Sequence, residues 1–175
     1  MTGNDIAVLL GFLAAAIALA GFAGIVTSID RGAAVASNEV ISFRVRNLVT
    51  SAVALVCLSL LPVLLEALEL FQSSLWQRCC LVSAVGIGAR VVSLLSARLR
   101  LAGKDAGLSR PLFATNLTLG ALAFVVLVAG AFGAVAARGA YFTGLFYLLY
   151  LMCTLFHRMV AMADAAASHA ATKKQ

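Results

Sequence analysis

Five long apolar runs, separated by segments that carry charge, constrain this chain more than any other feature of its sequence. Each run is close to the roughly 20 residues that an α-helix needs to cross the hydrocarbon core of a bilayer. With 63% hydrophobic and 11% charged residues, the chain has more apolar surface than a soluble core of its size can hide. We therefore predict an all-α, polytopic membrane bundle that forms one domain over residues 1–160, followed by a tail over residues 161–175. The predicted spans are residues 6–29, 47–68, 78–97, 112–136 and 141–160.

The first run is expected to be a retained helix. It follows Met-Thr-Gly-Asn-Asp, without lysine or arginine, and it exceeds the 7–15 apolar residues typical of a signal peptide. Small residues recur at intervals of four along it, which gives a smooth face for close helix packing. This face predicts packing within one subunit or, alternatively, between subunits of an oligomer. The residues concerned are Gly11, Ala15, Ala16, Ala20 and Gly24.

The distribution of basic residues predicts the orientation. With five spans, one side of the membrane carries Arg31, Arg44, Arg46, Arg98, Arg100, Lys104, Arg110, Arg158, Lys173 and Lys174, and the other carries Arg78 and Arg138. Because positively charged loops stay in the cytoplasm, we expect the N-terminus outside and the C-terminus in the cytoplasm. A four-span alternative would fuse the last two runs, but Arg138 interrupts them unless it marks a broken helix.

Arg90 is the feature that most needs an explanation, since it lies inside the third apolar run. It is roughly 20 Å from Trp76 and roughly 12 Å from Arg98 along a helix. An arginine at that depth costs at least about 2–3 kcal/mol and should have polar partners. Three interpretations are open: snorkelling to the cytoplasmic headgroups, a buried structural pair, or a cation that organises a polar vestibule.

The cytoplasmic halves of the other spans supply candidate partners for this vestibule. They are Asn47, Thr50, Ser51, Asn116, Thr118, Thr154 and His157, with Asp30 and Glu39 as possible counter-ions. If no carboxylate pairs with Arg90, the site favours an anion, a phosphate or a lipid headgroup, because guanidinium binds these groups through two hydrogen bonds. At the opposite end of the second span, Glu66 and Glu69 are either solvated carboxylates or an acidic ring at a pore mouth.

No pattern in the sequence predicts an enzyme, a cofactor or a metal site. The motifs G-x-S-x-G, H-E-x-x-H and Walker A are absent. All four cysteines fall inside apolar runs and are expected to pack as small apolar side chains. With His169 in the tail, His157 has no second histidine for a haem within the bilayer. The net charge of +6 is spread between spans, which argues against nucleic acid and for contact with anionic lipid of the cytoplasmic leaflet.

Several short segments resemble those of small bacterial inner-membrane proteins that cross the membrane several times and have no assigned activity. They are Phe22-Ala23-Gly24-Ile25, Arg44 in the following loop, Leu61-Pro62, Trp76, Leu148-Leu149-Tyr150-Leu151 and His157-Arg158. The resemblance implies a bacterial inner membrane as the location.

Three functions fit these observations. The first is a homo-oligomeric channel or pore-like protein with a polar vestibule around Arg90. The second is an accessory subunit of a larger membrane complex. The third is an anion- or lipid-binding transporter, which requires Arg90 to contact its ligand.

Overall fold

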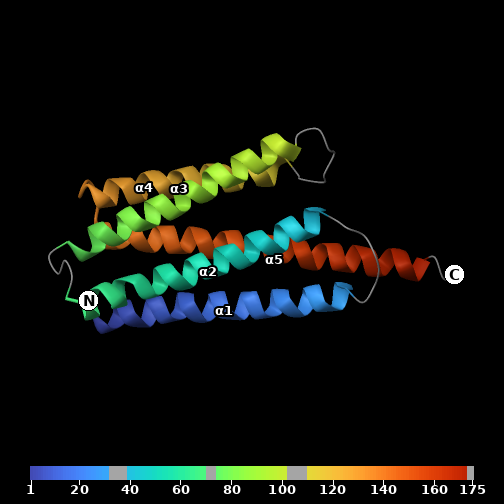
Figure 1. Cartoon of the computed structure of the whole chain (residues 1–175), viewed down its shortest axis with the longest axis horizontal. Helices are drawn as coiled ribbons and strands as arrows, with labels where there is room; N and C mark the ends of the chain where they lie inside the picture. Colours follow the sequence, from blue (N-terminus) through green and yellow to red (C-terminus); the bar gives the residue numbers. More distant parts are fainter. Residues whose placement is uncertain (32–38, 70–73, 102–109, 173–175) are drawn as a thin grey trace.

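The structure is a computed structural model that describes residues 1–31, 39–69, 74–101 and 110–172. Within these ranges the chain forms five α-helices and no strand (Figure 1). Every helix contains a stretch long and apolar enough to cross a membrane. The predicted all-α fold with five membrane-length helices is therefore confirmed. The helices are α1 (Gly3–Arg31), α2 (Glu39–Ala67), α3 (Leu75–Leu101), α4 (Arg110–Ala131) and α5 (Ala137–Thr172).

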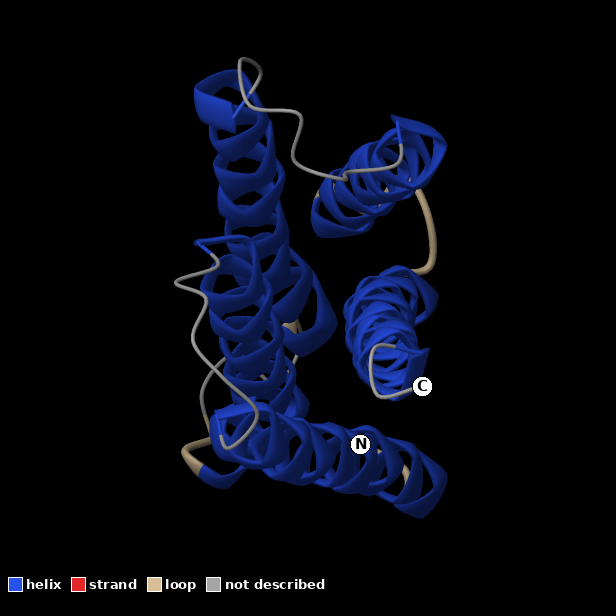
Figure 2. Cartoon of the chain, turned by 90° about the vertical axis from the view of Figure 1, so that its right-hand side faces the viewer, coloured by secondary structure: helices blue, strands red, loops and turns tan. Residues whose placement is uncertain are grey.

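Helix α5 is the central element of the bundle, because it packs against each of the other four helices. Helices α1 and α2 form a pair on one side of it, and α3 and α4 form a pair on the other (Figures 1 and 2). Successive helices run in opposite directions, so the start of α1 lies at the same end as the start of α5 (Figure 1). We call this the Asp5 end and the opposite one the Arg46 end.

The helices extend beyond most of the predicted spans, and two of the differences change a connection. Helix α2 begins at Glu39, before the predicted span at Asn47, so part of the charged segment is helical. Helix α4 ends at Ala131 rather than Ala136, and Gly133 follows with a positive φ of 76°. Glycine adopts that backbone conformation without steric cost and so terminates the helix.

The second of these differences places Arg138 inside the first turn of α5, where a turn between spans was expected. Arg138 is stabilised there by Asp5 of α1, whose carboxylate Oδ1 lies 2.5 Å from the arginine Nη2. The Asp5 side chain is only 3% exposed, and Thr2 caps it through its backbone N–H and its hydroxyl, both at 2.9 Å. This ion pair joins the first and last helices at the Asp5 end.

The core of the bundle is apolar and closely packed between α4 and α5. A Cβ added at Gly130 would lie 2.6 Å from the Ala140 Cβ, and one added at Gly144 would lie 2.9 Å from Leu127. Glycine at these two positions therefore lets the helices approach each other, as is common between membrane helices. Cys79 and Cys80 are fully buried in this core, whereas Cys57 and Cys153 lie on the exposed surface.

A buried tyrosine compensates for the proline in α2. Pro62 has no N–H, so the carbonyl of Leu58, four residues earlier, loses its helical hydrogen bond. The hydroxyl of Tyr141 on α5 donates to that carbonyl. Because the interior of a bilayer offers no water to replace a missing backbone partner, this bond satisfies a group that would otherwise be costly.

Replacing Tyr141 with phenylalanine should therefore lower the free energy of unfolding by about 1–3 kcal/mol, the usual cost of an unsatisfied buried polar group. In a Pro62→Ala background the loss should be smaller, because the new amide at position 62 can bond to the Leu58 carbonyl. Unfolding in mixed detergent micelles measures both values. An equal loss in the two backgrounds would show that the tyrosine does not act through this carbonyl.

Candidate functional site

Arg90 lies within the apolar part of α3, and its guanidinium is bonded to α2. Its Nη1 donates to the side-chain Oδ1 of Asn47 at 3.3 Å, and its Nη2 donates to the Asn47 backbone carbonyl at 2.9 Å. The same Nη2 also donates to the hydroxyl of Ser51. The expectation that Arg90 contacts polar groups of the second span is met by these bonds.

The register of α2 explains why these two residues act together. Asn47 and Ser51 are four positions apart, so their side chains lie one above the other on the same helix face. Both are buried, and the Ser51 hydroxyl donates to the Asn47 carbonyl at 2.8 Å while it accepts from Arg90. One turn of α2 thus offers three oxygen acceptors to one guanidinium.

Helices α4 and α5 are joined beside α3 by Tyr147. Tyr147 is buried on α5, near Gly120 of α4 and near Val91, the residue that follows Arg90 on α3. Its hydroxyl donates to the backbone carbonyl of Asn116 on α4 at 3.3 Å. Gly120, one turn further along α4, leaves room for it, since a Cβ there would lie 2.6 Å from the Tyr147 oxygen. Side chains or backbone groups from four helices therefore meet at this level of the bundle.

The partners of Arg90 are all electrically neutral in the part of the chain that the structure describes. Two ion pairs between described residues, Met1 with Glu66 and Arg138 with Asp5, lie at the Asp5 end, away from Arg90. The side chains of Asp30 and Glu39, suggested as counter-ions, lie outside the described part. Arg90 thus carries a positive charge within an apolar stretch of α3 that hydrogen bonds stabilise but no described carboxylate neutralises.

Three buried polar atoms around this arginine have no hydrogen-bond partner among the described residues. They are the Nε of Arg90, the side-chain Nδ2 of Asn47 and the side-chain Oδ1 of Asn116. A buried polar group without a partner costs about 1–3 kcal/mol. Two of the three, the Nε of Arg90 and the Nδ2 of Asn47, are hydrogen-bond donors on side chains that are bonded to each other. These free donors favour a ligand that supplies hydrogen-bond acceptors.

Four other predicted vestibule residues do not contact Arg90. Three of them are hydroxyls that bond within their own helices: Thr50 donates to the Arg46 carbonyl, Thr118 to those of Ala114 and Thr115, and Thr154 to that of Leu151. Such back-bonding is the usual way for a helix to satisfy a hydroxyl. His157 is exposed on the surface of α5.

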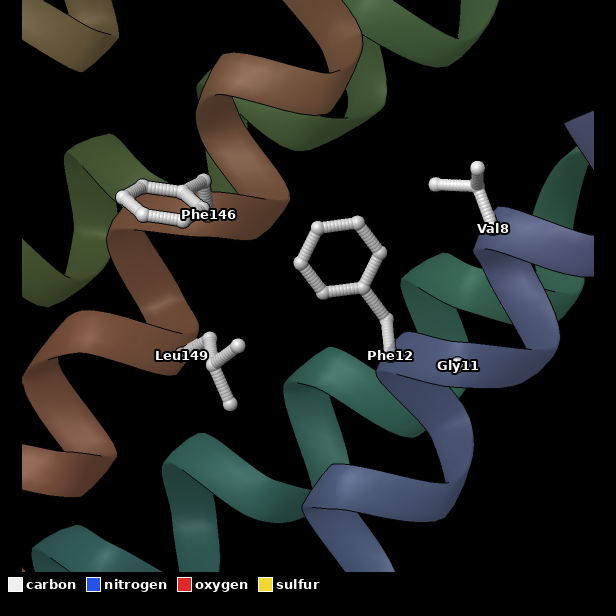
Figure 3. A pocket seen from close by; sticks show the side chains of 5 residues that line it. All are labelled: Val8, Gly11, Phe12, Phe146 and Leu149. Carbon is white, nitrogen blue, oxygen red and sulfur yellow. The ribbon is translucent and has the colours of Figure 1, made fainter.

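Some of the small residues of α1 pack inside the bundle, and others lie exposed on its surface. Ala16 is fully buried, and Ala15 and Ala20 are half-buried. Gly11 and Gly24 are exposed, and a Cβ built on either would meet no atom within 4 Å. Gly11 also lines an apolar groove of about 250 Å³ between α1 and α5 (Figure 3). The other residues lining this groove are Val8, Phe12, Phe146 and Leu149.

The two predicted pore-mouth carboxylates lie at the Asp5 end of α2. Glu66 is 44% exposed and accepts a hydrogen bond at 2.7 Å from the amino group of Met1. Glu69 follows the helix with a φ of 53° and is exposed. No described group of three or more histidine, cysteine, aspartate or glutamate side chains is arranged to hold a metal ion.

Comparison of the sequence with protein-family models and curated proteins, and of the fold with solved structures, finds no match.

Proposed function

We propose that this chain is a multi-pass protein of the bacterial inner membrane that binds an oxyanion, such as phosphate or a phosphate-bearing lipid headgroup, at Arg90. The observation that carries this proposal is that, among the described residues, Arg90 bonds to neutral groups only, at a depth where an unneutralised charge is costly. An anion supplied by the cytoplasm or by the inner leaflet would provide the missing negative charge. Anion or lipid binding, with transport as its extension, fits this geometry better than a pore lined by Arg90, because the guanidinium is bonded within one subunit.

Hydrogen-bond donors support an oxyanion as the ligand. The Nε of Arg90 and the Nδ2 of Asn47 are buried donors without a described partner. Charge-assisted bonds from guanidinium to phosphate oxygens are among the strongest that proteins form. Binding at this position would therefore satisfy both donors and lower the cost of the buried charge at once.

The orientation of the chain in the membrane is part of the same proposal. Arg46 of α2, Arg158 of α5, the end of α3 and the start of α4 at Arg110 lie toward the Arg46 end, and the positive-inside rule assigns that end to the cytoplasm. The Arg90 site then lies in the cytoplasmic half of the membrane, and the C-terminus is cytoplasmic. A fluorescent protein fused to the C-terminus should fold and fluoresce, whereas an alkaline phosphatase fused there should be inactive; the reverse pattern would invert the topology.

Asn47→Asp tests the proposed anion site directly. The new carboxylate has almost the same shape as the amide, keeps an oxygen at the Arg90 guanidinium and neutralises its charge. We expect phosphate affinity to fall at least about tenfold, because like charges placed together cost more than 1.4 kcal/mol. The melting temperature without phosphate should not fall. Thermal unfolding in detergent, repeated during phosphate titration at constant ionic strength, measures both the phosphate affinity and the melting temperature, because a ligand stabilises the state that it binds.

Gln77→Glu is the matched control, because it makes the same amide-to-carboxylate change roughly 20 Å away along α3. It should leave phosphate affinity unchanged. Native mass spectrometry after purification with phosphatidylglycerol or with phosphatidylcholine distinguishes a lipid headgroup from free phosphate. The proposed anion site is contradicted if the unmodified protein binds neither phosphate nor phosphatidylglycerol. It is also contradicted if Asn47→Asp binds phosphate as tightly as the unmodified protein does.

A homo-oligomeric channel is a second candidate, favoured by the exposure of α1. Only 17% of its apolar stretch is buried within the subunit, and the exposed Gly11 allows close approach of another helix. We expect Gly11→Leu to lower the native mass of the purified protein in detergent if α1 joins subunits. Unchanged mass would exclude this interface, and chains of different sequence in the complex would instead support the accessory-subunit function.

A further inference from the structure

The charge around Arg90 narrows the class of anion that suits its site. Among the described residues, the guanidinium is bonded to the amide oxygen and carbonyl of Asn47 and to the hydroxyl of Ser51, and all of these groups are neutral. Arg46, the residue before Asn47, lies exposed on the outer surface of α2, whereas Asn47 is buried. The described side chains thus give the site a single positive charge.

Granted the proposed anion site, on which this inference rests, we propose that Arg90 and Asn47 select a singly charged phosphodiester over a doubly charged phosphate or phosphomonoester. In a phosphodiester the phosphorus carries two ester bonds and two terminal oxygens, which share one negative charge. The headgroup of an anionic phospholipid and a soluble phosphodiester have this chemistry in common.

The first support is the apolar environment of Arg90. The residue lies within an apolar stretch of α3, and its exposed neighbours along the helix, Ala89 and Val92, are apolar. The cost of removing an ion from water rises with the square of its charge, whereas its attraction to one guanidinium rises only in proportion to that charge. A monoanion leaves the site neutral, but a dianion replaces one unneutralised charge with another.

The second support is the set of hydrogen-bond donors that remain for a ligand. Nη1 and Nη2 of Arg90 are bonded to α2, so the buried donor nitrogens without a described partner are the Nε of Arg90 and the Nδ2 of Asn47. Their side chains are bonded to each other, with 3.3 Å between Nη1 and Oδ1. Each nitrogen can donate to one terminal oxygen of a phosphodiester, whereas a phosphomonoester has a third charged oxygen that neither nitrogen serves.

Two small soluble ligands test the charge preference. Dimethyl phosphate is a diester with one negative charge, and methyl phosphate is a monoester with close to two at pH 8, because its second pKa is about 6. Each is titrated at constant ionic strength into the full-length protein in detergent, and thermal unfolding measures the affinity. We expect dimethyl phosphate to bind at least about tenfold more tightly, because the dianion leaves an excess buried charge.

A second positive charge beside Arg90 should weaken this preference. Ser93 is exposed about one turn after Arg90, and side chains of a helix tilt toward its N-terminus, so a lysine at position 93 extends toward the arginine. Ser93→Lys should raise the affinity for methyl phosphate at least about threefold more than that for dimethyl phosphate. Ser96→Lys is the matched control, because it places the same charge on another face of α3 and one turn further away, and it should leave the ratio unchanged.

The phosphodiester preference is overturned if methyl phosphate binds the unmodified protein as tightly as dimethyl phosphate does, or if the folded Ser93→Lys variant keeps the same ratio of affinities. Failure of the unmodified protein to bind any phosphate compound or phosphatidylglycerol is a different result, which contradicts the proposed function itself. Phosphatidylglycerol added to the micelles separates the two sources of a phosphodiester. Competition with dimethyl phosphate identifies a lipid headgroup as the ligand, and undiminished binding of dimethyl phosphate identifies a soluble one.

Discussion

The bundle depends on the satisfaction of polar groups that a bilayer cannot solvate, and the bond between Arg90 and α2 is the most demanding case. A guanidinium at this depth needs oxygen acceptors, and a single turn of α2 provides them from Asn47 and Ser51. These bonds fix the relative rotation of α2 and α3, because only one face of α2 presents both residues. The same bonds leave the charge unneutralised by any described side chain, so the arrangement that stabilises the arginine also makes it attractive to an anion.

Helix α5 meets the same constraint through two tyrosines. Tyr141 donates to the Leu58 carbonyl that Pro62 deprives of a partner, and Tyr147 donates to the Asn116 carbonyl. The central helix is thus fastened by tyrosine hydroxyls to α2 on one side and to α4 on the other. Tyrosine suits this task, because its ring contributes apolar packing while its hydroxyl reaches a backbone acceptor.

Much of this arrangement could be predicted from the sequence, because bilayer thickness relates residue number to depth. Counting along five spans put Arg90 at the level of Asn47, and the structure joins these two residues. Counting residues along the spans could not show whether Ser51 or its neighbour Thr50 bonds to Arg90, because that depends on the rotation of α2 about its axis. The Asp5–Arg138 pair was also missed: Arg138 was assigned to a turn, whereas Gly133 ends α4 early enough to place Arg138 in the first turn of α5. The bond from Tyr147 to the Asn116 carbonyl needs the space that Gly120 leaves, and a single glycine within an apolar run gives no periodic pattern that would predict it.

For a protein of the inner membrane, as proposed, the order of the helices along the chain has a consequence for insertion during synthesis. Asn47 and Ser51 precede Arg90, so α2 is already made when the ribosome delivers the arginine of α3. The hairpin of these two helices can shelter the guanidinium from lipid at the moment of insertion. The chain is therefore arranged so that the arginine follows its hydrogen-bond partners and precedes the last helix, α5.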